Sequence, residues 1–279
     1  MDYKTILVHL DRGAHPDKRL QLALALAKAF KAKLLGLFAV SESRMPAYAV
    51  SQASSAMVEL LQRNRSEAMR ASETLFNTAI FQSEGIEPEW RSAEDDPAEA
   101  VCRAARYSDL VVLGQRDSDS EIDDGMPAGF VDQVVLEAQR PVLVVPHAGR
   151  FDTVGKRILI AWDAGREATH AVTSALPLLR RADMVHVVAF DPHERGDHGD
   201  IPGADIGLYL ARHGVKVSIA EQTGSGLEVG SQILSRAADQ CVDLIVMGAY
   251  SHSLLRQRLF GGVTREILET MTVPVLMAH

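Results

Sequence analysis

The chain has 279 residues, which allows one large domain or two domains of ordinary size. Apolar residues make up 47% of it and charged residues 24%, as in an ordinary globular protein, so extensive disorder is not expected. The formal net charge of -8 argues against a nucleic-acid partner that is held by phosphate neutralisation.

Neither export nor membrane insertion is expected. The N-terminal residues run straight into an apolar strand and lack the basic region of a signal peptide, and no apolar stretch reaches the roughly 18 residues of a membrane helix. Cys102 and Cys241 fall in helical patterns of different halves. Buried free thiols are the preferred interpretation and suit a reducing compartment, with a disulfide as the alternative. We therefore expect a cytoplasmic protein without a membrane partner.

In the first half, buried strands alternate with helices. The apolar, β-branched run at 6–10 predicts a strand that is buried on both faces, as in a parallel sheet, and Asp11 follows it. Helical spacing then places four apolar residues on one face: Leu20, Ala23, Leu24 and Ala27. Asp96 and Pro97 form a helix start signal, an N-cap followed by proline, and the apolar run at 110–113 predicts another strand.

The second half repeats this pattern. Three landmarks recur: residues 6–11 return at 158–163, 109–114 at 243–248, and 141–146 at 274–279. The offsets are 152, 134 and 133, so the first half carries about 18 extra residues between its first and second landmarks. The surplus is assigned to the polar stretch 45–69, and the short polar segment 147–155 is interpreted as a linker.

Strands that alternate with helices predict right-handed βαβ units and therefore an α/β fold, with a doubly wound parallel sheet in each half. The predicted domains span residues 1–147 and 154–279. In such sheets, ligands bind beyond the carboxyl ends of the strands, where the strand order reverses. The residues that follow each strand are therefore the candidates for a functional site.

The strongest candidate site lies in the second half. Gly248 ends a strand, and Gly261 and Gly262 open a helix that continues through Val263 and Thr264. A glycine-rich turn before a helix aims unpaired N–H groups and the positive end of the helix dipole at one point, which suits a phosphate. The Thr264 hydroxyl adds a further hydrogen-bonding group. A simple turn without a ligand is the alternative interpretation.

This pattern resembles the nucleotide loop of the universal stress protein family, G-x2-G-x9-G-[S/T]. Gly248 matches the first glycine and Gly261 the third, whereas Ser251 stands at the second glycine and Gly262 at the hydroxyl residue. The resemblance covers nearly the whole chain, in the tandem two-domain form of the family. It includes the aspartates at strand ends and the repeated DLVVLG and DLIVMG runs.

The resemblance implies five parallel strands per half in the order 3-2-1-4-5. It also implies binding of ATP or AMP, with Mg²⁺ as a companion of the nucleotide, in members that keep the loop. Asp163 matches an aspartate that lies at the adenine and ribose in this family, and capping of the following turn is its alternative role. Gly262 lacks the usual hydroxyl, so binding is expected to be weaker by about one hydrogen bond, on the order of 1 kcal/mol.

The first half is expected to be degenerate. Gly114 is kept, but Gly125 and Gly129 stand at the wrong spacing, within an acidic loop. Carboxylates in that loop would repel a triphosphate. The first half is therefore predicted to hold no nucleotide and to have a structural or interface role.

Two loops and three histidines are further candidate sites. Residues 191–200 combine histidines and carboxylates at spacings that suit a metal, but no rigid helix fixes them, so a solvated loop without metal is preferred. Residues 223–226 are interpreted as a loop and N-cap. His9, His170 and His186 fall in strand or helix patterns and are expected to be structural.

Three functions fit these patterns. The preferred one is an adenine-nucleotide-binding protein with a regulatory or stress-protective role and no assigned catalytic residue, since no GxSxG elbow or nucleophile–base pair is present. The second is an enzyme, at most a slow ATP hydrolase. The third is a partner-binding module whose nucleotide sites have decayed.

The final strand of each half, at 142–145 and 275–278, is expected at a sheet edge. An exposed apolar edge strand seeks a partner. In the related family such edges pair two domains about a pseudo-twofold axis. The halves are therefore predicted to pair within one chain, and further association of chains into a homodimer is allowed.

Overall fold

The computed structural model describes residues 2–13, 15–41, 54–117, 124–151, 153–190, 203–223, 228–250 and 262–279. The chain divides into two compact units. The first unit is Tyr3–Ala138, and the second unit is Gln139–His279 together with Met1–Asp2.

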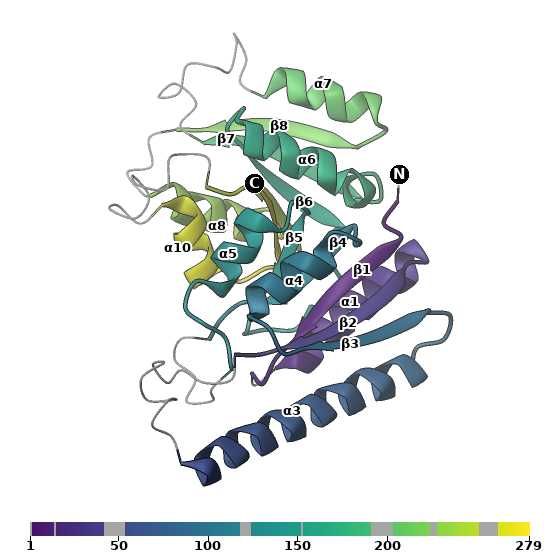
Figure 1. Cartoon of the computed structure of the whole chain (residues 1–279). Helices are drawn as coiled ribbons and strands as arrows, with labels where there is room; N and C mark the ends of the chain where they lie inside the picture. Colours follow the sequence, from purple (N-terminus) through teal and green to yellow (C-terminus); the bar gives the residue numbers. More distant parts are fainter. Residues whose placement is uncertain are drawn as a thin grey trace. The chain divides into compact units, whose positions relative to one another are not determined.

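The first unit is a parallel sheet with helices. Its elements in chain order are β1 (Thr5–Leu10), α1 (Pro16–Phe30), β2 (Lys33–Ala39), α3 (Ser55–Phe81), β3 (Pro88–Ala93), α4 (Pro97–Ala105), β4 (Leu110–Gly114) and α5 (Phe130–Glu137). The strand order is β3-β2-β1-β4, with every pair parallel. Helices α4 and α5 pack against each other, while α3 packs on α1, β2 and β3 (Figure 1).

The second unit repeats this arrangement. Its elements are β5 (Val142–Val145), β6 (Arg157–Trp162), α6 (Arg166–Leu179), β7 (Met184–Phe190), α7 (Ala204–Arg212), β8 (Val217–Gln222), α8 (Val229–Asp239), β9 (Leu244–Gly248), α10 (Val263–Thr270) and β10 (Val275–Ala278). Strands β8-β7-β6-β9-β10 are parallel, which confirms the predicted α/β fold and the order 3-2-1-4-5. Strand β5 also belongs to this unit, where it pairs antiparallel with β10, with Val144 opposite Val275.

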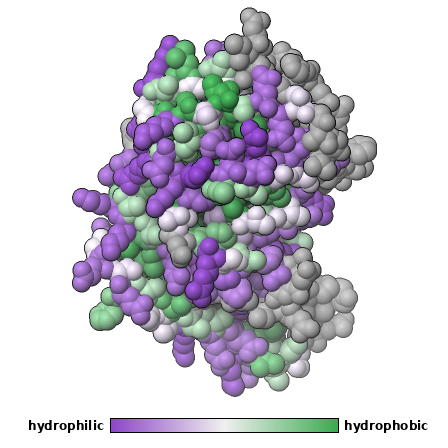
Figure 2. All heavy atoms as spheres, turned by 180° about the vertical axis from the view of Figure 1, so that it is seen from behind, coloured by the Kyte–Doolittle hydropathy of each residue, from purple (hydrophilic) through white to green (hydrophobic). Residues whose placement is uncertain are grey.

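The central strands are fully buried, as their continuous apolar runs predict. Residues with no exposed surface include Ile6, Leu7 and Val8 in β1 and Ile158, Leu159 and Ile160 in β6. On the face shown in Figure 2, hydrophilic residues predominate and hydrophobic residues are scattered among them. The hydrophobic core of each unit therefore lies between its sheet and its helices.

The surplus of the first half is a longer helix. Helix α3 has 27 residues, whereas its counterpart α7 has 9, and this difference of 18 equals the predicted surplus. Only Ser72 and Phe76 of α3 are buried, and the Phe76 ring packs on Trp90 of β3 with the ring centroids 5.3 Å apart. The extension of α3 therefore adds mostly exposed surface.

The aspartate at the start of each repeated run, Asp109 in DLVVLG and Asp243 in DLIVMG, accepts hydrogen bonds from backbone N–H groups at the amino edge of its sheet. Asp109 Oδ2 accepts hydrogen bonds from the backbone N–H groups of Lys4 at 2.6 Å and Thr5 at 2.9 Å. Asp243 likewise accepts from three N–H groups in the segment that leads into β6, the last of them Arg157 at 3.0 Å. The repeated aspartate is thus explained by the fold alone.

Three smaller sequence predictions have clear outcomes. Asp96 caps α4, because its Oδ1 accepts hydrogen bonds from the N–H groups of Ala98 and Glu99 at 2.9 and 3.1 Å. Both cysteines are free, as preferred, but the predicted burial is wrong, because Cys102 is partly exposed and Cys241 is exposed. None of the helices in the described ranges has the length and apolar character needed to cross a membrane.

Candidate functional site

The predicted site residues of the second unit lie at the carboxyl edge of its sheet. Asp163 follows β6 and Gly248 ends β9, and these strands are neighbours, with Ala161 opposite Met247. Parallel neighbours end at the same edge, so Asp163 and Gly248 share it. Gly262 is the N-cap of α10, and Val263 and Thr264 form its first turn. Ser251 and Gly261 lie outside the described residues.

Asp163 has a structural contact of its own. Its Oδ1 accepts a hydrogen bond from the Gly165 N–H at 2.9 Å, which caps the turn between β6 and α6. The side chain is partly exposed at the sheet edge. The alternative role considered for Asp163 is therefore present in the structure.

Gly248 is required by helix packing. A Cβ atom at this position would lie 2.5 Å from the Ala168 nitrogen and 2.7 Å from the Glu167 carbonyl carbon, both in the backbone of α6. Such contacts are far shorter than van der Waals distance, so only glycine allows α6 to approach β9 this closely. The fold thus supplies a reason for this glycine that is independent of any ligand.

The start of α10 has the features of an anion-binding helix N-terminus. Gly262 is extended and provides no side-chain cap. The Gly262 carbonyl accepts hydrogen bonds from the N–H groups of Arg265 at 2.9 Å and Glu266 at 3.2 Å. The N–H groups of Val263 and Thr264 precede these and have no intrahelical partner. The first turn therefore presents donors and the positive end of the dipole.

The Thr264 hydroxyl holds the preceding loop. Its Oγ1 accepts a hydrogen bond from the Tyr250 N–H at 3.2 Å, and Thr264 is buried. The Ala249 N–H donates to the Ala278 carbonyl at 2.9 Å, which extends the pairing of β9 with β10. Thr264 therefore holds Tyr250 just after β9, a role that the sequence did not reveal.

Sequence reasoning missed an acidic side chain at this edge. Glu167, in the first turn of α6, is buried, and its carboxylate pairs with Arg166 at 3.1 Å. Its Cβ lies 2.9 Å from the position that a Gly248 side chain would occupy. The sequence could have indicated this residue, because Glu167 follows Asp163 by four positions and lies at the start of the helix. Asp163 and Glu167 together make this part of the edge acidic.

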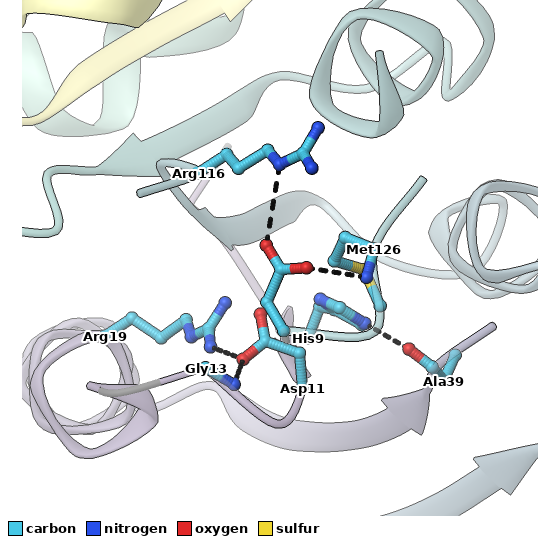
Figure 3. A network of polar contacts seen from close by, with 8 residues as sticks. His9, Asp11, Gly13, Arg19, Ala39, Arg116 and Met126 are labelled. Atoms are coloured by element: carbon cyan, nitrogen blue, oxygen red, sulfur yellow. Dashed lines mark hydrogen bonds and ion pairs between the residues drawn. The ribbon is translucent and has the colours of Figure 1, made fainter. Parts of the chain in front are cut away.

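The first unit is built differently at the same edge (Figure 3). Asp11, the counterpart of Asp163, accepts hydrogen bonds at Oδ1 from Arg19 Nη2 at 2.6 Å and from the Gly13 N–H at 2.8 Å. The side chains of Arg19 and Asp11 are only 6% and 10% exposed. A Cβ atom on Gly114 would lie 2.5 Å from Arg19 Nη1, so the guanidinium covers the end of β4. The buried Arg19–Asp11 ion pair occupies this position.

Backbone from the loop after β4 also crosses the strand ends of the first unit. The Arg12 N–H, after β1, donates to the Asp124 carbonyl at 3.2 Å, and the Ser41 N–H, after β2, donates to the Gly125 carbonyl at 2.8 Å. Met126 is buried, and its N–H donates to Asp124 Oδ1 at 2.9 Å. The carboxyl edge of the first unit is thus covered by its own chain.

Burial and the Arg19 charge together set the charge states of His9 and Asp11. Burial lowers the pKa of His9 to about 4, with Asp11 opposing and Arg19 adding to the shift. Neutral His9 donates from Nε2 to the Ala39 carbonyl at 2.8 Å. Burial alone would raise the pKa of Asp11, but Arg19 outweighs it through charge and hydrogen bonding, so that the pKa of Asp11 lies below its usual value. Asp11 is therefore charged and His9 uncharged at neutral pH.

Comparison with known families matches two segments of the chain, residues 2–146 and 155–279, to the model of the universal stress protein family. The chain belongs to the universal stress protein family. A universal stress protein from Synechocystis sp. is 26% identical over 176 residues, which cover 60% of this chain and 57% of that protein. The match thus spans little more than half of this relative.

Solved structures agree with the assignment. The crystal structure of a universal stress protein from Archaeoglobus fulgidus has a TM-score of 0.73 at 16% identity and covers 98% of this chain and 95% of its own. A putative universal stress protein from Pseudomonas aeruginosa has a TM-score of 0.58 at 19% identity, with 99% and 93% covered. At these identities the likeness establishes the fold.

The two halves of this universal stress protein therefore differ at the edge where ligands of such sheets bind. In the second half, Arg19 is replaced at the 152-residue offset by Ala171, which has no exposed surface. The small side chain leaves no guanidinium to cover Gly248. The metal-compatible loop 191–200 and residues 224–227 of the second candidate loop lie outside the described residues.

Proposed function

We propose that the second unit binds one adenine nucleotide, ATP or AMP, and that the protein acts in regulation or stress protection in the cytoplasm. The observation that carries this proposal is the contrast between the two carboxyl edges. Arg19 and the 124–126 backbone cover the edge of the first unit, whereas α10 of the second unit begins with Gly262 and no side-chain cap.

The proposed pose follows from the polarity of the edge. The base and ribose carry hydrogen-bond donors and belong near the acidic side, at Asp163. The phosphates belong at the N–H groups of Val263 and Thr264, with the Gly261–Gly262 turn approaching them. Mg²⁺ would accompany ATP and be held mainly by its phosphates. By the family resemblance, we also assign Gly248, Ser251 and Gly261 to the nucleotide-binding loop.

The test is calorimetric titration of the full chain with ATP and AMP. Asp163→Asn is the informative variant, because its amide oxygen still accepts from the Gly165 N–H while an NH₂ group replaces the second acceptor oxygen. We expect one site per chain and about tenfold weaker binding in this variant. A bulky residue in Gly261→Val should abolish binding. Two equal sites, or unchanged affinity in both variants, would contradict the proposal.

The proposal is a binding function, and hydrolysis is its main enzymatic competitor. Among the described residues, no group of three or more His, Cys, Asp or Glu side chains is arranged to hold a metal ion. Turnover of radiolabelled ATP by the purified chain separates the two functions. A rate that falls in parallel with affinity in Asp163→Asn would favour the hydrolase.

We also propose that the two predicted domains, residues 1–147 and 154–279, pair within one chain through the β5–β10 ladder. Its support is the antiparallel register, in which Leu143 lies opposite Leu276. Proline at position 143 would remove a ladder donor and disturb β5. We expect Leu143→Pro to release two independently unfolding domains in calorimetry, and a single unchanged transition would contradict this. Sedimentation velocity of the wild type tests whether two chains associate further.

A further inference from the structure

A cationic cluster lies at the amino edge of the second unit, away from the proposed nucleotide site. Arg157 is the first residue of β6, His186 is the third residue of β7, and Arg236 is in the last turn of α8, which packs on β7 (Figure 1). Arg157 is paired with Met184, two residues before His186, so Arg157 and His186 lie on the same face of adjacent strands. The strand register therefore brings these side chains together.

The two arginines of this cluster, Arg157 and Arg236, have no ion-pair partner in the described part of the chain. Arg236 Nε and His186 Nε2 are both buried without a hydrogen-bond partner among the described residues. His186 Nδ1 contacts Ser218 Oγ at 2.8 Å, which orients the ring. Two donor-bearing side chains thus have unmet hydrogen-bonding capacity.

Nearby carboxylates do not neutralise the cluster. Asp183 precedes β7, Asp239 lies one turn after Arg236, and Asp243 precedes β9. The Asp243 carboxylate accepts three backbone N–H groups, including that of Arg157 at 3.0 Å. None of the three forms an ion pair with Arg157 or Arg236 within the described ranges. Burial lowers the pKa of His186, and Arg157 and Arg236 lower it further.

Like charges gathered in this way repel one another, and a bound anion would relieve that repulsion. A guanidinium presents a fork of N–H donors that matches the oxygens of a phosphate, and two such forks with a hydroxyl nearby match a tetrahedral dianion. We propose that Arg157, Arg236 and His186, with Ser218, form a binding site for a phosphate group. The group belongs to inorganic phosphate or to a small phosphorylated metabolite.

This site is distinct from the proposed nucleotide site. Arg157 begins β6 and Asp163 follows its end, and a strand of six residues spans about 20 Å. One nucleotide of ordinary size cannot reach both edges of the sheet. The two sites therefore predict separate binding events on the same unit, and either proposal can fail without the other.

The test follows the His186 ring by NMR during titration with inorganic phosphate at constant ionic strength. The His186→Gln variant assigns its resonance among the ten histidines. A bound dianion stabilises the imidazolium, so we expect phosphate to raise the pKa of His186. Arg157→Gln and Arg236→Gln should each weaken phosphate binding at least tenfold. Arg157 is exposed, so its substitution leaves the core intact.

Arg180→Gln is the matched control. Arg180 caps the end of α6 at the same edge, and its guanidinium contacts His213 Nδ1 at 3.2 Å, so this variant should bind phosphate like the wild type. Titration with ribose 5-phosphate separates the two sources, because tighter binding than inorganic phosphate identifies a metabolite and equal or weaker binding identifies the free ion. An unchanged His186 titration, or equal loss in Arg180→Gln and Arg157→Gln, would overturn the proposal.

Discussion

Replacement of Arg19 by methionine should destabilise the first unit strongly. Arg19 Nη2 lies 2.6 Å from Asp11 Oδ1, and both side chains are at most 10% exposed. Arg19→Met keeps a long unbranched side chain but leaves the Asp11 carboxylate buried without its counter-ion. Loss of one partner of a buried ion pair costs about 3–5 kcal/mol. We therefore expect the free energy of unfolding of the first unit to fall by about that amount.

The double variant separates charge from packing. Asp11→Asn keeps an oxygen that accepts the Gly13 N–H, so Asp11→Asn/Arg19→Met removes both charges and retains the turn. Replacement of a buried pair by neutral residues is often close to neutral in stability. We expect the double variant to be more stable than Arg19→Met, with a coupling energy of about 2 kcal/mol or more.

Tryptophan fluorescence can report this unit alone. The chain has two tryptophans, Trp90 on β3 of the first unit and Trp162 at the end of β6 in the second. Urea unfolding in a Trp162→Phe background therefore follows the first unit through Trp90. A cost below about 1 kcal/mol for Arg19→Met, or additive effects of the two substitutions, would refute the inference that this ion pair is buried and coupled.

Three further predictions concern single residues. Folding lowers the pKa of His9 from its ordinary 6.5 to about 4. Between these two pH values the unfolded chain carries a proton on His9 that the folded chain lacks, so the free energy of unfolding falls as the pH drops from 6.5 to 4. The loss should be about 3 kcal/mol. His9→Gln, which keeps a donor for the Ala39 carbonyl, should remove this dependence in urea unfolding, and an identical pH profile would contradict it. Gly248→Ala should lower the free energy of unfolding of the second unit, followed through Trp162, by about 1–3 kcal/mol, because the alanine Cβ would clash with the α6 backbone. An unchanged urea midpoint would show that α6 does not approach Gly248 this closely. Thr264→Val should destabilise the second unit by about 1 kcal/mol, because the part-buried Tyr250 N–H loses its hydrogen bond to the Thr264 hydroxyl. Thr264→Ser serves as the control, and equal stability of the two variants would count against the hydrogen bond.

The fold could be predicted because its signals are local. Continuous apolar runs such as 6–10 and 158–160 are typical of strands buried on both faces, and Asp96 with Pro97 marks a helix start. The strand order 3-2-1-4-5 came from the resemblance to the universal stress protein family, and the internal repeat applied it to both halves. The surplus of 18 residues was also visible, although its conformation, the longer helix α3, was not stated.

The covered edge of the first unit could not be predicted from local patterns. Arg19 lies in an ordinary helical stretch, and its burial depends on Asp11 and on the absence of a side chain at Gly114. Repulsion by the acidic loop is the sequence-based reason for expecting no nucleotide in the first half. In the described part of that loop, Asp124 instead pairs with Arg116 at 3.8 Å, and its carbonyl accepts a hydrogen bond from the Arg12 N–H.

Several candidate site residues also stabilise the fold, and the sequence alone could not distinguish this structural role from a role in ligand binding. Gly248 fits a phosphate loop by pattern, but the backbone of α6 already excludes a side chain there. Asp163 and Thr264 likewise hold turns through Gly165 and Tyr250. A motif of this kind can persist because the fold needs it, so the presence of these residues does not by itself establish binding.

The pairing of β5 with β10 has a consequence for synthesis on the ribosome. Val144 and Val275 face each other across the ladder but are separated by 131 residues in the chain. The four buried residues of β5 are therefore translated long before the strand that pairs with them exists. At a rate of about 5–20 residues per second, that interval lasts roughly 7–26 seconds. During it, the β10-facing side of an apolar strand is open to wrong partners, so the nascent chain should depend on chaperones most between the emergence of β5 and that of β10.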